Sequence, residues 1–579
     1  MTAGWDRRNR GRRSVSRSPA ISRTDHSFSI RTDSAPARWP QRASEGSGGV
    51  AMVGGAADRV QPMGEKIIVT NAGALKRKYG RTGYSAVLAA LRRLVAADRA
   101  RGLRTRVVSL DSVAAMRSYR GRAVTDAADA KQNKDAVDAI VAKSRPDYVL
   151  ILGSVDVVPH QDLANPLYST DDPDRHAFGD LPYACEAPYS RRINDFIGPT
   201  RVIGRLPDLT GATAPDYLVS LIDRTAAWRS LPRAEYEKPF AVTAKVWEGS
   251  TRLTLRALFR SETGVRLSPP RGPAWSGADL ERRVHLVNCH GVPASAEFYG
   301  DDGRSYPVSH RAAHVAGRIR PGTVAAVECC YGAELYDPSL LPGVQPGIAN
   351  VYLREGAYGY LGSTTIAYGE SDSTGAADLV CQYFLAGVLA GASLGRAALE
   401  ALQRYAREDT DLDPVDLKTL AQFVLLGDPS IHPVVVPKAP VRKRAGAAAA
   451  PAAVAPAPKR QERRLGLLRK GLGILQTQGT AVRGRTAPLP SVRSLLEQEI
   501  RRRKLVRGSA LNFAVAQPVL PVATRSGAKL TRAAAGPPAS FHVMFARGSD
   551  GPLDEGPVTV LVAKEVAGEV VSFRALQRR

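Results

Sequence analysis

The sequence predicts an α/β fold in which a parallel sheet is covered by helices. Between residues 65 and 437, short apolar runs of strand length alternate with longer segments whose apolar residues recur with helical spacing. This alternation is typical of βαβ units. At 579 residues the chain is too long for one ordinary domain, and its apolar share of 44% is ample for real hydrophobic cores.

A first α/β unit is expected over residues 65–235. Its longest helix, Tyr84–Arg99, gathers its apolar residues on one face. A stretch rich in Asp, Pro and His, 154–200, is expected to be mostly loop. The predicted strands are Lys66–Asn71, Thr105–Leu110, Tyr148–Gly153 and Thr200–Asp208, and the other helices are Lys134–Ser144 and Ala214–Trp228.

A second α/β unit is expected over residues 236–437. It opens on the strand Phe240–Trp247 and ends in the turn Leu426–Ser430, followed by the apolar run Ile431–Val436. Between these lie a strand at Ala357–Gly362 and two apolar runs, Val284–Gly291 and Thr323–Gly332, each of which is expected to be a buried strand that stops at a Gly-containing turn. The predicted helices are Thr251–Ser261, Ile348–Glu355, Ala376–Ala390, Leu394–Arg407 and Asp416–Phe423.

The rest of the chain has a different composition. Residues 1–62 form a basic leader without periodicity, and residues 438–464 form an Ala/Pro/Lys/Arg linker; both are expected to be disordered. Residues 465–579 are expected to form a small C-terminal region to which the sequence assigns no role. Its predicted elements are a basic helix at Leu495–Leu505 and strands at Ser540–Ala546 and Val558–Glu565.

The formal charge of +26 suggests at first a nucleic-acid-binding protein. The excess is concentrated in residues 1–62 and 438–507, however, which leaves the α/β units close to neutral. Solvated, flexible charge is the simpler interpretation. Nonspecific contact of these basic tails with nucleic acid or an acidic partner is the alternative.

The five cysteines form an odd and unevenly spaced set, which predicts a reducing compartment rather than a disulfide framework. The N-terminus has no continuous apolar stretch between Trp5 and Arg42, and no window of the chain reaches the length of a membrane-spanning helix. We therefore expect a cytoplasmic protein without a signal peptide or a membrane partner.

Two of the apolar runs end in reactive side chains. The first leads into Cys289, His290 and Gly291, and the second leads into Cys330 and Gly332. Parallel neighbouring strands would bring these ends to one edge of the sheet, where open α/β sheets build their sites. An imidazole and a thiol would then meet, which is the minimum equipment for thiol nucleophilic catalysis.

In that arrangement Cys330 attacks a carbonyl, His290 protonates the leaving amine, and water releases the acyl group from a thioester. Gly291 and Gly332 give the turns room, and backbone N–H groups beside them stabilise the oxyanion. A neighbouring imidazolium is expected to lower the pKa of the thiol. The alternatives are an inert buried thiol and a core histidine, or a zinc site made of Cys289, His290, Cys329 and Cys330.

Several motifs resemble the gingipain-type family of cysteine peptidases, in the caspase–gingipain clan. The motifs around the proposed site are VECCYGAELYD (327–337), GAYGYLGSTTIAYGESD (356–372) and LLGDPSIHP (425–433). The upstream motifs are DYVLILGSVDVVP (147–159), GDLPYA (179–184) and IGRLPD (203–208). This resemblance implies a caspase-like parallel-sheet sandwich with a preceding α/β subdomain.

The resemblance also implies roles for individual residues. Cys330 is the nucleophile, because Cys330-Tyr331-Gly332 fits the clan's Cys-x-Gly pattern, and His290 is its acid/base partner. Glu248 is the candidate for the acid that orients His290. The family prefers Arg or Lys before the cut bond, which makes Tyr368, Glu370 and Asp372 candidates for the substrate pocket. Calcium enters only through this resemblance, and the predicted chemistry requires no cofactor.

The sequence therefore predicts a cysteine endopeptidase acting on proteins or peptides through a Cys–His dyad. Its main rival is a non-catalytic caspase-fold module that binds protein or nucleic acid through its basic tails.

Overall fold

The computed structural model describes residues 64–340, 345–435, 460–484, 487–518, 521–522, 529–530, 539–548 and 557–579. The predicted leader, residues 1–62, lies outside this range. The predicted linker also lies outside it as far as residue 459. The disorder expected for these two segments therefore stays a prediction.

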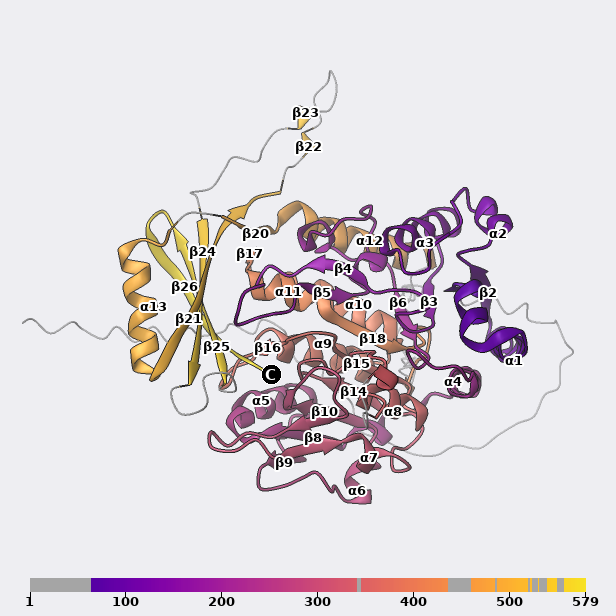
Figure 1. Ribbon diagram of the computed structural model, residues 1–579, viewed down its shortest axis with the longest axis horizontal. Helices are drawn as coiled ribbons and strands as arrows, with labels where there is room; N and C mark the ends of the chain where they lie inside the picture. The colour runs from indigo at the N-terminus through magenta and orange to yellow at the C-terminus, as the bar shows by residue number, and fades with distance from the viewer. Residues whose placement is uncertain are drawn as a thin grey trace, which may run out of the picture. The chain divides into compact units, whose positions relative to one another are not determined.

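A ten-stranded sheet, which we call the core sheet, runs through the described chain in the order β2-β1-β3-β6-β18-β15-β14-β10-β8-β9 (Figure 1). Every neighbouring pair is parallel except β15 and β18. The contact of β18 with β6 joins the strands of the two predicted α/β units into one sheet. The strands are β1 Gly64–Thr70, β2 Leu103–Ser109, β3 Tyr148–Leu152, β6 Ile203–Leu206, β8 Pro239–Ala244, β9 Val265–Ser268, β10 Val284–Asn288, β14 Val324–Val327, β15 Gly359–Ser363 and β18 Phe423–Gly427.

The helices that accompany this sheet mostly follow the predicted pattern. One correction concerns the first, which begins at Ala72 rather than Tyr84 and is interrupted at Gly80, where φ is 66°. Local signals set other ends: Asp129 caps α3, and Asp413 and Asp416 form a capping box for α11. The helices are α1 Ala72–Ala100, α2 Val113–Ser118, α3 Ala130–Ser144, α4 Asp216–Ala226, α5 Glu248–Phe259, α6 Gly277–Leu280, α7 Ala312–Val315, α8 Ile348–Arg354, α9 Ala377–Leu389, α10 Leu394–Tyr405 and α11 Pro414–Gln422.

The end of the second unit differs from the prediction. The expected turn at Leu426–Ser430 begins too early, because residues Phe423–Gly427 form β18 directly after α11. Of the expected run after that turn, only β19, Val434–Val435, is a strand, and it pairs with β7, Leu231–Pro232.

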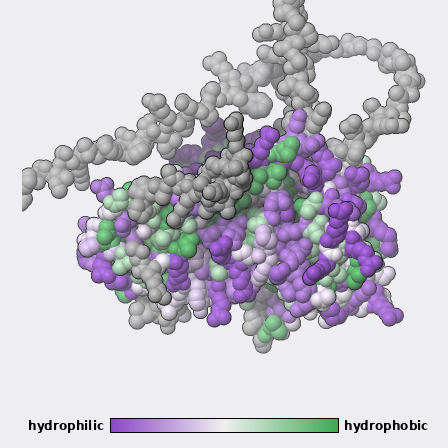
Figure 2. Space-filling model, turned by 90° about the horizontal axis from the view of Figure 1, so that it is seen from above, coloured by the Kyte–Doolittle hydropathy of each residue, from purple (hydrophilic) through white to green (hydrophobic). Residues whose placement is uncertain are grey.

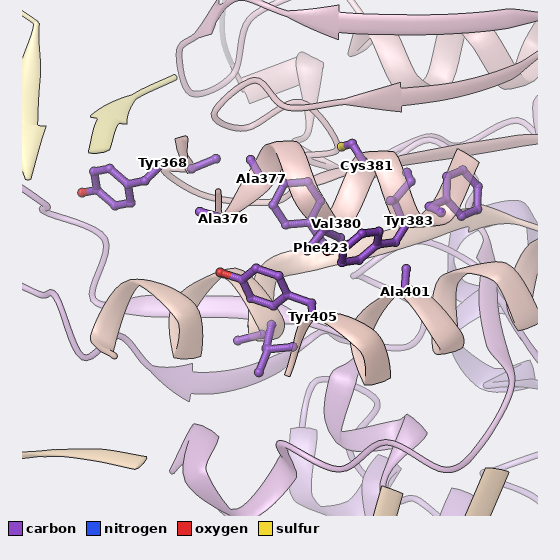
Figure 3. Close-up of a cluster of buried hydrophobic side chains, with 14 of the residues drawn as sticks. Tyr368, Ala376, Ala377, Val380, Cys381, Tyr383, Ala401, Tyr405 and Phe423 are labelled. Carbon is purple, nitrogen blue, oxygen red and sulfur yellow. The ribbon is translucent and has the colours of Figure 1, made fainter. Parts of the chain in front are cut away.

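Side chains from the two faces of the core sheet form two separate apolar clusters. Along β10, Val284 and Leu286 join one cluster, whereas Val287 joins the other. This alternation follows from the two-residue period of a strand, and burial of both faces is typical of a parallel sheet. Figure 3 shows part of the first cluster, where α9 and α10 pack together beside Phe423. Hydrophilic side chains prevail on the face of the molecule seen in Figure 2.

The region after residue 464, which the sequence left without a role, forms a second sheet. This C-terminal sheet has the order β16-β26-β25-β24-β21-β20-β17, and α13, Pro490–Arg502, lies against it (Figure 1). The predicted elements are present, but β21 and β26 were not predicted. Its strands are β16 Tyr368–Gly369, β17 Asp411–Leu412, β20 Gly479–Arg483, β21 Leu505–Ala516, β24 Ala539–Gly548, β25 Val558–Val566 and β26 Glu569–Arg578.

One further helix begins inside the predicted linker. α12 spans Arg460–Thr477, so the last residues of the segment 438–464 are helical. The helix is held because Leu467 packs with Val202 and Leu399, and Ile474 enters the first core cluster. Within the described residues, none of the helices has the length and hydrophobicity needed to cross a bilayer.

Short strands complete the fold near the site. β11 His290–Gly291, β12 Glu297–Tyr299 and β13 Val308–Arg311 form a small antiparallel sheet. β4 Gln161–Ala164 and β5 His176–Gly179 form a hairpin in the stretch expected to be mostly loop. The short pair β22 Pro521–Val522 and β23 Lys529–Leu530 stands apart from the two large sheets.

Candidate active site

The two strands that carry the reactive side chains are parallel neighbours. β10 pairs with β14 from Val284 opposite Val324 to Val287 opposite Val327. Both strands therefore end at the same edge of the core sheet, and His290 and Cys330 follow these two ends within a few residues.

The two strand ends touch through their backbones. A Cβ atom placed on Gly291 would lie 1.8 Å from the carbonyl oxygen of Cys330. No side chain fits at this distance, so only glycine permits this approach. The residue beside His290 is thereby in direct contact with Cys330.

Cys330 is fully buried. Its Sγ lies 3.2 Å from the backbone nitrogen and 3.4 Å from the carbonyl oxygen of Ala367. Burial raises the pKa of the Cys330 thiol, an effect that Arg578 and the Ala367 N–H partly oppose. The expected lowering of this pKa is therefore wrong for the arrangement seen here, because desolvation outweighs the nearby charges.

The neighbouring Cys329 lies on the other side of the sheet. It belongs to the second core cluster, whereas Cys330 belongs to the first. Burial raises the pKa of Cys329 as well. The pair thus separates into one thiol that adjoins the His290 loop and one that packs into the core.

His290 is held by a carboxylate that the sequence did not single out. Its Nε2 lies 3.0 Å from Oδ2 of Asp301, which follows the neighbouring strand β12. Because a carboxylate only accepts, Nε2 carries a proton and Nδ1 is left as the basic nitrogen. Asp301 is itself fixed, since its Oδ1 accepts from the Gly303 N–H at 2.6 Å.

Aromatic rings enclose the imidazole. The Trp247 ring centroid lies 4.4 Å from that of His290, and the Tyr306 centroid lies 5.2 Å away. Burial lowers the pKa of His290, although Asp301 acts in the opposite direction. The histidine is therefore neutral at physiological pH, the form that can accept a proton.

Glu248, the predicted partner of His290, is wrongly assigned. Its carboxylate pairs with Arg252 one turn along α5, at 2.6 Å, on a half-exposed helix face. Glu248 was suggested by its place after strand β8. The residue from that segment that contacts the imidazole is Trp247. Here the residue next to the predicted one makes the contact.

The turn after Cys330 has strained geometry. Tyr331 adopts a φ of 54°, and its hydroxyl donates to Oδ1 of Asp174 at 2.7 Å. A Cβ on Gly332 would lie 2.9 Å from a methyl group of Val327, so the turn has no room for a side chain there. The Cys330 N–H, the predicted oxyanion donor, points to the carbonyl oxygen of Arg579 at 3.4 Å.

A pocket beside the two catalytic candidates holds the Arg579 side chain, which is fully buried. Its Nη2 donates to Oδ1 of Asp378 at 2.9 Å and to the carbonyl oxygen of Glu370 at 2.6 Å. The guanidinium also lies 4.2 Å from the ring centroid of Trp247. A Cβ on Gly369 would come within 2.3 Å of the guanidinium, so glycine keeps the pocket open.

Asp378 is positioned to bind a cation. Its Oδ2 accepts from the backbone N–H groups of Glu370 and Gly375, at 3.0 and 3.3 Å, which leaves Oδ1 for the guanidinium. Glu328 is also fully buried nearby, and burial together with the charge of Asp378 raises its pKa well above the ordinary value. The side chains of Asp378 and Glu328 therefore both lie near Arg579.

The three predicted pocket residues take different places. Tyr368 is buried in the first core cluster, where its hydroxyl donates to Asp172 at 2.8 Å and points away from the helices (Figure 3). Glu370 contributes its backbone carbonyl to the pocket, while its carboxylate faces Arg574 at 3.5 Å. Asp372 lines a separate cavity of about 290 Å³ together with Arg503 and Gln577.

The sequence thus missed Asp301, Trp247 and Asp378. Asp301 lies in a polar loop, DDGRSYP, in which nothing marks one acid among several. A weak signal for Asp378 exists, because it is an acid in the first turn of the otherwise apolar helix α9. Burial of an acid needs a partner, so that position could have been flagged.

The alternative zinc site would need Cys289, His290, Cys329 and Cys330 to face one another. Among the residues that the structure describes, His, Cys, Asp and Glu side chains nowhere gather in threes or more in a way that could hold a metal ion. The four proposed zinc ligands are divided between the two faces of the sheet, since Cys289 and Cys329 belong to the second cluster.

Comparison with known proteins finds a family that is similar to the first part of the chain. A sequence model described as peptidase family C25 matches residues 63–256. No curated protein sequence matches the chain. The structure of the complex of Porphyromonas gingivalis RgpB pro- and mature domains shares 12% identity with the chain, over 88% of this chain and 99% of that one, with a TM-score of 0.43.

Two other solved structures are similar at the same level. That of the Arg-specific cysteine proteinase gingipain R shares 11% identity over 90% of this chain and 98% of that one, with a TM-score of 0.42. A structure described only as a protease shares 13% identity over 89% and 97%, with a TM-score of 0.41. Residues 63–256 of the chain are thus similar to peptidase family C25, the resemblance that the sequence motifs predicted.

Proposed function

We propose that the protein is a cysteine endopeptidase that cleaves proteins or peptides after arginine. The observation that carries this proposal is the meeting of Cys330, the His290–Asp301 pair and the Asp378 pocket at one edge of the core sheet. The family match supports the peptidase class.

The reaction starts when Nδ1 of His290 takes the thiol proton of Cys330. The thiolate attacks the carbonyl carbon before the cut bond, and the Cys330 N–H stabilises the resulting oxyanion. The tetrahedral intermediate expels the amine, which receives its proton from His290. Water, activated by the same imidazole, then hydrolyses the thioester and regenerates the thiol.

Asp301 acts as a positioning residue in this scheme. It accepts a hydrogen bond from Nε2 and so holds the imidazole in the tautomer whose Nδ1 is basic. These steps use only groups of the chain, so the proposed activity requires no cofactor.

The preference for arginine is supported by the shape and charge of the Asp378 pocket. A planar guanidinium can bind the Asp378 carboxylate and the Glu370 carbonyl at once while stacking on Trp247. The ammonium of lysine could make both hydrogen bonds, which here come from the single atom Nη2, but it lacks the planar face that stacks on Trp247. We therefore expect arginine to be preferred over lysine, and acidic residues to be rejected.

A substrate-like electrophile tests the proposal. A peptidyl-arginine chloromethyl ketone should alkylate Cys330, as located by mass spectrometry, and the Cys330→Ala variant should not be labelled at any comparable rate. Cys329→Ala is the matched control and should still be labelled at Cys330, and His290→Ala should be labelled far more slowly. Equal labelling of several thiols, independent of His290, would instead favour a non-catalytic binding module.

A further inference from the structure

The end of β26 and the residue after it, Arg579, lie beside Cys330 and the Asp378 pocket. We call this region the active-site cleft. β26 pairs with β16 in antiparallel register, with Arg578 opposite Tyr368 and Gln577 opposite Gly369. The C-terminus lies beside β16, close to the end of the core sheet that carries the site (Figure 1). A strand of the C-terminal sheet is thereby added to the segment that follows Cys330 in the core.

The backbone of Arg579 continues this strand-like arrangement. Its N–H donates to the carbonyl oxygen of Ala367 at 3.0 Å, and its carbonyl oxygen accepts from the Cys330 N–H at 3.4 Å. The latter is the donor to which the proposed mechanism assigns the oxyanion. A main-chain oxygen of the protein itself therefore occupies the position expected for a reacting carbonyl.

The side chains of these residues fill the adjoining positions. Arg579 enters the Asp378 pocket, and Gln577 accepts from Trp247 Nε1 at 2.5 Å and from Ser371 Oγ at 2.9 Å. Burial of a guanidinium is costly unless charge and hydrogen bonds compensate. Here a carboxylate, a carbonyl and an aromatic face all do so.

The rest of β26 acts as a support for this tip. Its pairing with β25 runs from Glu569 opposite Val566 to Gln577 opposite Thr559, and the register with β25 ends there. Arg578 and Arg579 find their partners on the core side instead. Most of the strand is thus paired within the C-terminal sheet. Its tip, residues 577–579, is bound to β16 and to the residues around Cys330.

We infer that residues 577–579 are an intramolecular, substrate-like occupant of the active-site cleft that competes with peptide substrates. This inference rests on the proposed function, because it identifies the cleft as the substrate site. The occupant keeps Cys330 buried, and access of a substrate requires the tip of β26 to leave while its base stays paired with β25.

The size of the effect follows from tethering. A segment attached to the site by a short connection has an effective concentration on the order of 1 mM or more. Substrates typically have KM values of about 1 μM to 1 mM. A tethered occupant that binds with a dissociation constant of about 0.1 mM or tighter therefore reduces turnover of dilute substrate by about tenfold or more.

The test compares the chain with its Arg579→Gln variant in two assays. One measures the rate at which iodoacetamide modifies Cys330, and the other measures hydrolysis of a fluorogenic peptidyl-arginine amide. We expect both rates to rise at least about tenfold, because the glutamine cannot pair with Asp378. Arg502→Gln, which removes an exposed arginine that contacts only Glu499 on α13, is the matched control and should change neither.

The two assays separate the inference from the proposed function. Faster modification of Cys330 in Arg579→Gln without hydrolysis by either chain would support the occupant and refute the peptidase. Hydrolysis that depends on Cys330 but is equal in both chains, together with equal modification, would retain the peptidase and overturn the occupant.

A second experiment guards against a variant that fails to fold. Gln577→Ala removes the contacts to Trp247 and Ser371 but leaves Arg579, and it should raise both rates by a smaller factor. In addition, a synthetic peptide of residues 571–579 should inhibit the Arg579→Gln chain competitively, whereas the same peptide ending in Gln should not. Absence of inhibition by the arginine peptide would count against the inference.

Discussion

The core sheet and the C-terminal sheet contribute to the same cleft in different ways. The core sheet supplies Cys330 and the His290 loop from the ends of two parallel strands. The C-terminal sheet is antiparallel along most of its length and supplies the tip of one strand, Arg579. The first arrangement fixes side chains by burial on both faces, and the second adds a strand at an edge.

The core sheet would thus provide the reacting groups, whereas the C-terminal sheet would provide the segment that occupies the substrate site. Residues of the core sheet and its loops provide the proposed reacting groups, and their removal should affect the catalytic step. Residues of the C-terminal sheet bind where a substrate would bind, and their removal should affect access. The predictions below test this division, beginning with the largest effect.

Cys330→Ala should lower kcat/KM for peptidyl-arginine amides by about 10⁴-fold or more, since it removes the nucleophile. The measurement is steady-state hydrolysis, made on a background with Arg579→Gln so that the cleft is open. Cys329→Ala should retain activity within about threefold, because that thiol packs into the other cluster. Equal losses in both variants would break the distinction between the two cysteines.

His290→Ala should lower kcat by about 10³-fold, in the range expected for loss of a general acid–base group. KM for the same substrate should change little, because Asp378 and the Glu370 carbonyl, which bind the guanidinium, stay in place. An effect confined to KM would assign His290 to binding instead of proton transfer.

Asp378→Asn should lower kcat/KM for arginine substrates by about 10²-fold, as expected when one partner of a desolvated charge pair is lost. The loss should be much smaller for a substrate with a neutral residue in that position. The same variant should also free Cys330 for alkylation, because Arg579 loses the same partner. A uniform loss over all substrates would show a structural role instead.

Asp301→Asn should lower kcat by about tenfold to 10²-fold, and Glu248→Gln should leave it unchanged within about twofold. The carboxylate of Asp301 raises the pKa of His290, so its removal should move the imidazole's apparent pKa to lower pH. A pH profile of kcat distinguishes this shift from a loss of folded protein. An equal effect of Glu248→Gln would restore the partner that the sequence suggested.

Acid should weaken the core sheet through His285 and His310, which are fully buried and share Tyr352 as a hydrogen-bond partner. Burial lowers the pKa of His285 to about 4 and that of His310 to about 3. Both are therefore protonated more readily after unfolding, at a pKa of about 6.5. Their contribution to stability is complete above pH 6.5 and is lost as the pH falls toward 4.

The free energy of unfolding should decrease by roughly 1.4 kcal/mol per pH unit for each of these histidines. Urea unfolding at pH 7, 6 and 5, monitored by tryptophan fluorescence, measures this slope. His310→Gln should remove about half of it. A stability that is constant over this range would contradict the lowered pKa values.

The sequence predicted the core sheet well where its signals are local. The apolar runs before His290 and Cys330 are strands β10 and β14, as expected, because their short length and the Gly-containing turns that follow them favour buried strands over helices. β18 was missed because it follows α11 without a turn residue between them. β26 was missed because EVVSFRALQR mixes charges and apolar residues without clear alternation.

The candidate site could be predicted only for residues fixed by the strand ends. Cys330 and His290 follow their strands directly, and the parallel pairing brings them together. Asp301 and Asp378 lie 11 residues and more from any predicted reactive group, and tertiary packing alone brings them there. No local pattern shows that residue 579 meets residue 378.

The absence of a side chain at Gly291 has a final consequence. Because the backbone of Gly291 lies against the carbonyl group of Cys330, a side chain at position 291 would push the histidine loop away from Cys330. Even the single methyl group of an alanine at this position would separate His290, the proposed proton acceptor, from Cys330, the proposed proton donor. Neither of these two residues would itself be altered. The residue at position 291 thus determines how closely the histidine loop approaches Cys330, and with it the spacing of the two proposed catalytic residues.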